Sequence, residues 1–133
     1  MSQFVYFNPN PDQKTDKKTG NPKRWNKGDC VVRGFCGVLN LTWTSCFEKL
    51  CLIAAKEFDM PDSHKVIDKM AKTNGMVKES LPEYMTVSEF ASTHDGTYIC
   101  NIRGHVCCVK NNSIYDTWNC GGYKMKTYYA KAA

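Results

Sequence analysis

The spacing of apolar residues changes once along the chain, near residue 96, and this change limits the folds that the sequence can adopt. Before it, apolar residues recur every three or four positions, as on one face of a helix, most clearly across 42–58. After it, apolar and polar residues alternate as in strands, over 97–103, 105–110 and 113–118. Helices followed by consecutive strands predict an α+β domain whose N-terminal helices pack on a C-terminal antiparallel sheet.

Composition and capping residues divide the chain further. A chain of 133 residues has the length of a single domain. The range 8–28 is rich in Pro, Gly, Asn and Lys and predicts an extended arm, 29–95 is predicted to be mostly helical, and 96–133 to form antiparallel strands. Helices are predicted at 30–39, 42–58, 63–72 and 86–92, and a closing strand at 124–129.

The apolar run at 30–39 predicts a buried helix. Asp29 stands directly before it and is a residue type that caps helix N-termini, so we expect it to cap this helix. Gly34 and Gly37 would weaken an exposed helix, and they favour a buried one that approaches its neighbours closely.

Charge and hydropathy argue against nucleic-acid-binding, membrane and secreted proteins. The net charge of +5 is that of one segment, Lys14–Lys27, which holds six basic residues and one acidic residue. Nucleic acid is therefore an unexpected partner, and this segment is the one indication of it. No apolar run could span a membrane, and residues 1–11 lack the pattern of a secretory signal. We expect a cytoplasmic protein whose eight cysteines are reduced thiols.

Two polar residues on consecutive predicted strands are expected to meet. Asn111 and Asn112 tolerate the positive φ angles of a two-residue hairpin turn, which fixes the pairing of the flanking strands. This register, or that of a four-residue loop, places His105 and Asp116 on the face of Cys107, within reach of a hydrogen bond. A three-residue loop would turn Asp116 to the other face. A histidine held by a carboxylate is the base of a nucleophilic triad.

Cys30 is the candidate nucleophile for this pair. It begins the first predicted helix, where free backbone N–H groups and the helix dipole favour a thiolate. The neighbouring Asp29 has the opposite effect, so pairing with His105 has to supply the rest. Six other cysteines fall on core positions of helices or strands, where we expect them to be packing residues: Cys36, Cys46, Cys51, Cys100, Cys107 and Cys108.

The order of a Gly-Asp-Cys that opens a helix, a Gly-His strand and an Asp on the next strand resembles the papain-like cysteine peptidase fold. More narrowly, the chain resembles a family of small phage and prophage proteins. The motifs that carry this resemblance are Asn8-Pro9-Asn10-Pro11, Gly28-Asp29-Cys30-Val31-Val32-Arg33, Asp59-Met60-Pro61, Tyr84-Met85-Thr86-Val87, His94-Asp95-Gly96-Thr97-Tyr98, His105-Val106 and Tyr115-Asp116-Thr117-Trp118.

The resemblance implies a thiol hydrolase with Cys30 as nucleophile, His105 as base and Asp116 as the acid that orients the base. Its substrate would be a protein or peptide, cleaved at a peptide, isopeptide, glutamine amide or thioester bond, in the host cytoplasm if the protein is phage-encoded. An alternative of a different class is a catalytically silent phage protein that binds a host or immunity factor.

The donor that would complete an oxyanion hole stays open. Papain-like peptidases place a Gln six residues before the nucleophile, and Arg24 occupies that position here. Asn10, Asn8 or Asn26 could supply a side-chain amide beside the backbone N–H of Cys30, and Asn10 is the preferred candidate.

Metal sites and cofactors are not expected. The chain has no C-x-x-C motif and no closely spaced histidine pair, which structural zinc sites normally use. The sequence does not determine the oligomeric state.

Overall fold

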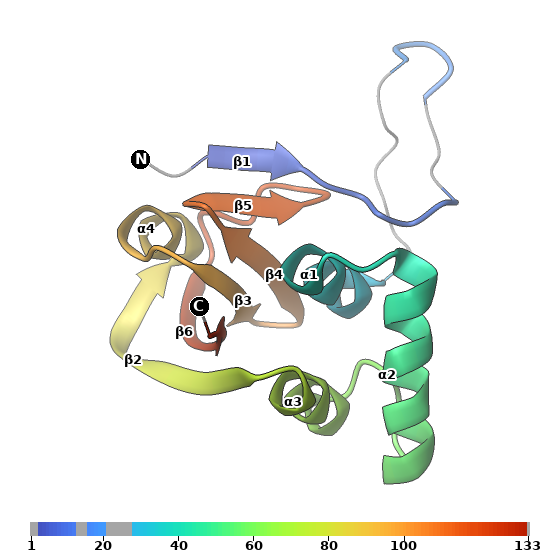
Figure 1. The fold of residues 1–133 in the computed structure, drawn as a ribbon. Helices are drawn as coiled ribbons and strands as arrows, with labels where there is room; N and C mark the ends of the chain where they lie inside the picture. Colours follow the sequence, from blue (N-terminus) through green and yellow to red (C-terminus); the bar gives the residue numbers. More distant parts are fainter. Residues whose placement is uncertain (1–2, 13–15, 21–27, 133) are drawn as a thin grey trace.

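The computed structural model describes residues 3–12, 16–20 and 28–132, and Figure 1 shows how their helices and strands are arranged. Each predicted helix is present, with bounds close to those expected. No helix among the described residues is long and apolar enough to cross a membrane. The elements are, in chain order, β1 (Gln3–Tyr6), α1 (Cys30–Leu39), α2 (Trp43–Glu57), α3 (His64–Thr73), β2 (Met76–Thr86), α4 (Val87–Thr93), β3 (Thr97–Ile102), β4 (His105–Lys110), β5 (Ser113–Asp116) and β6 (Lys124–Lys131).

The strands form one mixed sheet of six, in the order β1-β5-β4-β3-β6-β2. β1 pairs in parallel with β5, and the other neighbours are antiparallel. The prediction of a purely antiparallel sheet is therefore wrong at one edge. The prediction missed β1, because a strand of four residues is too short to show a period in the sequence.

β2 is the second strand that the sequence pattern does not predict. It lies at the opposite edge of the sheet, within the range predicted to be mostly helical. Only Met76 and Leu81 on it are buried, so its sequence shows no regular alternation. An edge strand tolerates Pro82 and the irregular pairing between Ser80 and Met85, because one side of it needs no ladder.

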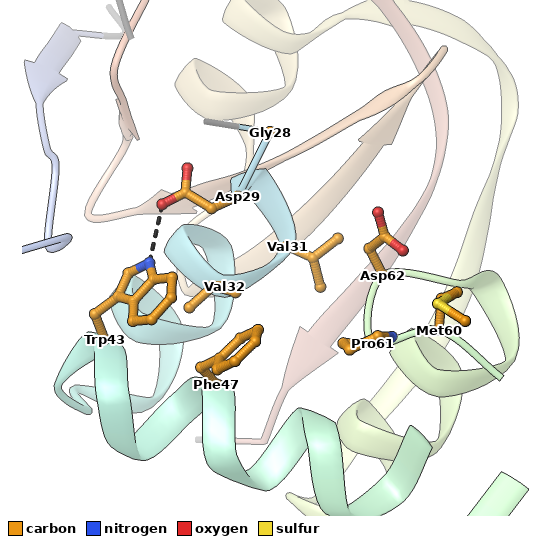
Figure 2. A pocket seen from close by; sticks show the side chains of 9 residues that line it. All are labelled: Gly28, Asp29, Val31, Val32, Trp43, Phe47, Met60, Pro61 and Asp62. Atoms are coloured by element: carbon orange, nitrogen blue, oxygen red, sulfur yellow. Dashed lines mark hydrogen bonds between the residues drawn. The ribbon is translucent and has the colours of Figure 1, made fainter. Parts of the chain in front are cut away.

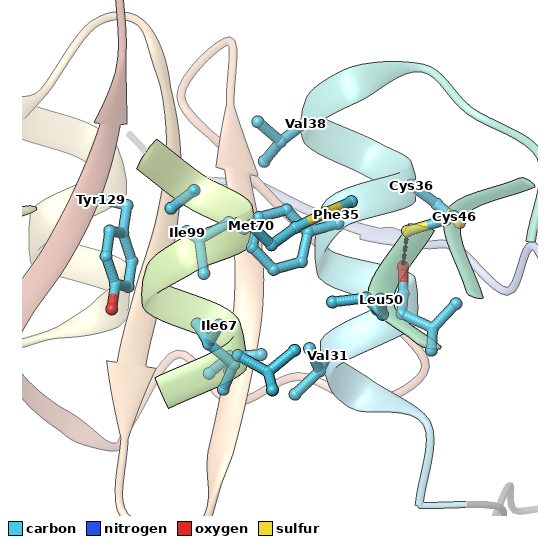
Figure 3. Packing of buried hydrophobic residues seen from close by; sticks show 14 of the residues in the cluster. Val31, Phe35, Cys36, Val38, Cys46, Leu50, Ile67, Met70, Ile99 and Tyr129 are labelled. Atoms are coloured by element: carbon cyan, nitrogen blue, oxygen red, sulfur yellow. Dashed lines mark hydrogen bonds between the residues drawn. The ribbon is translucent and has the colours of Figure 1, made fainter. Parts of the chain in front are cut away.

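Helices cover both faces of the sheet. α1, α2 and α3 pack with Val106 and Cys108 of β4 in one apolar cluster, part of which Figure 3 shows around Phe35 and Leu50. The alternate residue of β4, Val109, belongs to a second cluster with α4. Alternate residues of β4 therefore face opposite sides of the sheet, which is the period of two expected of a strand that is buried on both sides.

The two glycines of α1 allow the helix to lie very close to β4. All residues from Val31 to Val38 are buried. A Cβ added to Gly37 would lie 2.8 Å from Cys108 Sγ, and one added to Gly34 would lie 3.6 Å from Val106. The close approach predicted for this helix is confirmed. It helps to set the position of Cys30 relative to β4.

The turn between β4 and β5 has the predicted form. Asn111 and Asn112 have φ angles of 53° and 59°, in the left-handed region that a two-residue hairpin needs. Lys110 pairs with Ser113, and the residues further from the turn pair in the same register. β5 ends at Asp116, earlier than the predicted strand, but the register is the one that brings His105 and Asp116 together.

Candidate active site

Cys30 is the first residue of α1 and is half-buried. Burial by itself raises the pKa of its thiol. A hydrogen bond with His105 and one with the backbone of Val106 lower that pKa, and the charges of His105 and Arg33 lower it further. The balance puts the Cys30 pKa below its ordinary value, so the thiolate is favoured at this position.

His105 begins β4 and is held by Asp116. Its Nε2 lies 2.5 Å from Asp116 Oδ2, which leaves Nδ1 for the thiol of Cys30. Burial lowers the pKa of His105, but the hydrogen bonds with Asp116, Cys120 and Cys30, together with the charge of Asp116, raise it to about 11. The imidazole is therefore protonated at neutral pH, and Cys30 faces a cation.

Asp116 ends β5 and is 2% exposed. Its Oδ1 accepts a hydrogen bond from Arg33 Nη2 at 3.1 Å and one from the backbone N–H of Thr117 at 2.7 Å. Its Oδ2 accepts from His105 and, at 3.9 Å, from the thiol of Cys120. A carboxylate with this many donors is held in place, which is the property needed to orient an imidazolium.

Arg33 joins the two buried carboxylates of the site. It forms an ion pair with Asp29 one helical turn earlier, and its other nitrogen reaches Asp116. Asp29 is the N-cap residue of α1, as predicted, but its side chain makes no capping hydrogen bond. A buried carboxylate beside a buried guanidinium gains more from the ion pair than from a backbone N–H. Trp43 Nε1 also donates to Asp29, at 2.9 Å.

Two of the three candidate oxyanion donors, Asn10 and Asn8, lie within the described residues. Asn10 is buried, and its side-chain amide donates to Asp29 at 3.1 Å. Asn8 is buried too, and its side-chain oxygen accepts the backbone N–H of Asn10 at 3.2 Å. Asn26 lies outside the described residues, as does most of the basic segment Lys14–Lys27. An oxyanion role for any of the three stays a prediction.

Arg33 and Cys120 belong to the site although the sequence analysis does not single them out. Arg33 has a signal in the sequence, since it is a charged residue within an apolar helix, four positions after Asp29. Cys120 has no such signal in the sequence. It follows the last strand of the hairpin, and its contact with Asp116 is seen only in the folded structure. It is 0% exposed.

Three of these residues could in principle hold a metal ion. The ligand atoms of His105, Asp116 and Cys120 lie within 4.8 Å of one another. The guanidinium of Arg33 is bonded to the same carboxylate, however, and its positive charge opposes a cation there. The group fits a hydrogen-bonded network better than a metal centre.

The reactive side chains open into a cavity of about 190 Å³. Cys30 and His105 line one side of it, and Asp62, His64 and Ile67 are among the residues that line the rest. Trp118 lies on His105, with ring centroids 4.9 Å apart, and it is partly exposed. An indole in this place shields the bond between the imidazole and Asp116 from water, and so strengthens it.

No family model, no curated protein and no solved structure is significantly similar to the chain. The chemistry of the site is therefore inferred from its own geometry.

Proposed function

We propose that the protein is a thiol hydrolase of the papain-like type, which cleaves an acyl bond in a protein or peptide. One observation carries the proposal: Cys30, with a lowered pKa, and His105, held by the buried Asp116, line the same cavity. Nucleophile, base and orienting acid come from three separate elements, and a purely structural cysteine has no need of such an arrangement.

The reaction follows from these positions. The Cys30 thiolate attacks the carbonyl carbon of the substrate and forms a C–S bond, while the carbonyl electrons move to the oxygen. As the tetrahedral intermediate collapses, the bond to the leaving group breaks and the His105 imidazolium protonates that group. Water then attacks the thioester with His105 as base, releases the carboxylic acid and restores the thiolate–imidazolium pair.

The surrounding network keeps this pair ready to react. Asp116 holds His105 by Nε2, and Arg33 holds Asp116 in place by pairing with its other oxygen. The backbone N–H of Cys30 would be one oxyanion donor. Asn10 remains the candidate for the second, because its amide has two hydrogens and Asp29 accepts one of them.

The rate of alkylation at each thiol tests the proposal. Cys51 is a matched control, because it is half-buried like Cys30 but lies on α2, outside the site. We expect iodoacetamide at pH 6 to modify Cys30 about a hundredfold faster than Cys51, and His105→Gln to remove most of that difference. Equal rates at the two thiols would contradict the proposal, and binding of a host or immunity factor would then become the hypothesis to test.

The pH dependence of hydrolysis gives a second test. Activity should rise as Cys30 loses its proton, with a midpoint below the ordinary thiol pKa because that pKa is lowered. It should fall again as His105 loses its proton near pH 11, because the leaving group then lacks its acid. An acid limb that is the same in His105→Gln would show that the thiolate does not depend on the imidazole.

A further inference from the structure

Residues 3–12, called the N-terminal strap below, connect two parts of the active site. The strap begins as β1, which pairs in parallel with β5 as far as Asp116. The backbone N–H of Phe7 then donates to the backbone oxygen of Asp116 at 2.8 Å. Further along the strap, the side-chain amide of Asn10 donates to Asp29, the residue before the nucleophile. One short segment therefore contacts both the end of β5 and the start of α1.

The side chain of Asn10 is held in one orientation. Asn10 is 4% exposed, and its side-chain oxygen accepts the backbone N–H of Asp12 at 2.8 Å. Its own backbone N–H donates to the side-chain oxygen of Asn8 at 3.2 Å. Asparagine favours such local turns, and the prolines of the Asn-Pro-Asn-Pro motif restrict the backbone around them. The amide nitrogen of Asn10 is thereby directed at Asp29, 3.1 Å away.

Asp29 is the N-cap residue of α1, but its carboxylate does not cap the helix. An N-cap carboxylate ordinarily accepts a hydrogen bond from the N–H groups of the first turn. Three donors from three segments hold this carboxylate instead: Asn10 of the strap, Arg33 of α1 and Trp43 of α2. Figure 2 shows it directed at the indole of Trp43. The negative charge is therefore kept away from the first-turn N–H groups.

These donors, more than close packing, set the direction of the carboxylate. Asp29 and Trp43 line a cavity of about 410 Å³ beside the start of α1, so the carboxylate has space on one side (Figure 2). When a donor is lost, the carboxylate can turn toward the first-turn N–H groups. There it would oppose the helix dipole and lie closer to Cys30, and both changes disfavour a thiolate.

We propose that Asn10 is a positioning residue, through which the N-terminal strap keeps the Asp29 carboxylate away from the start of α1, where Cys30 reacts. The strap then supports both ends of the reactive group, because it also holds the backbone of Asp116. This inference rests on the proposed function, since the position of this charge matters only if Cys30 is the nucleophile. It is separate from an oxyanion role of Asn10, which would act on the substrate.

The pH dependence of alkylation by iodoacetamide separates these two roles. The thiolate attacks the CH₂ carbon of the reagent, a C–S bond forms and iodide leaves, so no oxyanion develops. The midpoint of the pH profile therefore reports the Cys30 thiolate alone. Mass spectrometry follows Cys30 in each variant, and thermal melting measures the stability of the same samples.

Four variants and one control test the role of Asn10. Asn10→Ala and Trp43→Phe each remove one donor to Asp29. Asp29→Asn removes the charge, and it is combined with Asn10→Ala in a double variant. Asn74→Ala is the matched control, because the Asn74 amide also donates to one backbone oxygen, at 2.8 Å, but lies at the end of α3, outside the active site.

The other charged or titratable groups around Cys30 are unchanged in these variants. They are His105 of β4, Arg33 of α1, Asp116 of β5, Asp62 in the loop before α3, and His64 at the start of α3. A shift of the midpoint that disappears when the charge of Asp29 is removed is therefore assigned to that charge.

Asn10→Ala should raise the midpoint of Cys30 alkylation by about half a pH unit, and Trp43→Phe by a similar amount. At pH values below the midpoint, this shift lowers the alkylation rate about threefold. The midpoint of Asp29→Asn should lie at or below that of wild type, and adding Asn10→Ala should not change it. Asn74→Ala should lower the melting temperature and leave the midpoint at its wild-type value.

Several results would overturn the inference while the thiol hydrolase stands. One is a midpoint that neither Asn10→Ala nor Trp43→Phe changes, and another is a shift that persists in the Asp29→Asn background. Peptide hydrolysis that falls about a hundredfold in Asn10→Ala with an unchanged midpoint would assign Asn10 to the oxyanion hole alone. If Asn10→Ala does not fold, Trp43→Phe decides, because it releases the same carboxylate.

The wild-type protein shows whether the proposed function itself fails. If its Cys30 has an ordinary midpoint that does not depend on His105, the proposed function fails and the inference fails with it.

Discussion

The two sides of His105 differ, although each holds a cysteine in contact with the ring. On one side Cys30 is half-buried at a cavity and its pKa is lowered. On the other side Cys120 is fully buried, and its pKa is raised by a hydrogen bond with the Cys107 thiol and by burial, although His105 acts in the opposite direction. Contact with an imidazolium is therefore not enough to make a thiolate.

The hydrogen bond with Cys107 and burial account for most of this difference, and Asp116 adds to it. Its Oδ2 lies 3.9 Å from Cys120 Sγ, so a thiolate there would stand against a carboxylate in a buried place. At Cys30, the hydrogen bond with His105, the backbone of Val106 and the charge of Arg33 favour the anion. The same histidine thus activates one thiol and leaves the other as a hydrogen-bond donor.

The largest expected effect comes from removing the thiol on the reactive side. Cys30→Ala should lower the rate of peptide hydrolysis by about a thousandfold or more, because the acyl intermediate can no longer form. Hydrolysis of a mixture of unstructured peptides, followed by mass spectrometry, measures this loss. A Cys30→Ala protein that retains the wild-type rate would show that another group performs the chemistry.

Arg33→Met breaks the network that both sides share. It leaves Asp29 and Asp116 buried without their guanidinium, which should cost about 3–5 kcal/mol of unfolding free energy. Denaturant titration measures this loss. The matched control is Arg103→Met, which replaces an exposed arginine and should change stability by less than about 0.5 kcal/mol. Equal effects of the two substitutions would mean that the bridge contributes nothing to the fold.

Gly37→Ala tests how the closeness of α1 and β4 positions the reactive side. The new Cβ would meet Cys108 Sγ at 2.8 Å, and we expect a loss of about 1–3 kcal/mol and slower alkylation of Cys30 as the helix shifts. Gly34→Ala is the control, because its Cβ would meet Val106 at an ordinary 3.6 Å. It should be neutral or stabilising by up to about 1 kcal/mol. Thermal melts that rank the two variants the other way would contradict this account.

The smallest effect is expected from Cys120→Ala. Asp116 keeps its bonds from Arg33, Thr117 and His105, so only packing and weak hydrogen bonds of the Cys120 thiol are lost. We expect a loss of about 1–2 kcal/mol of stability and a change of less than about threefold in the alkylation rate of Cys30. A large fall in that rate would show that Cys120 is needed to position His105, and that the two sides are not independent.

Local signals in the sequence predicted the parts of the fold that depend on near neighbours. Thr42, Ser63 and Thr86 each accept a backbone hydrogen bond and begin a helix where expected. The Asn111–Asn112 turn sets the register, and the contact between His105 and Asp116 follows from it. These features need only a few residues of context, because caps and tight turns are closed by bonds within one segment.

Several features that depend on distant parts of the chain were not predicted. β1 joins the sheet beside β5, more than a hundred residues later, and Arg33 reaches Asp116 across 83 positions. At Asp29, local sequence and tertiary packing favour different roles. Its position favours a cap, but burial beside Arg33 gives its carboxylate a stronger partner.

The sequence by itself determined the helices, the hairpin and the meeting of a histidine with an aspartate, because periodicity, capping and turn chemistry act over short distances. Only the tertiary structure decided that the pKa of Cys30 is lowered despite its burial, which charges lie buried around it, and where the cavities open. The physical reason is that the pKa of a thiol depends on burial and on charges brought together from separate elements, and these are set only when the chain is packed.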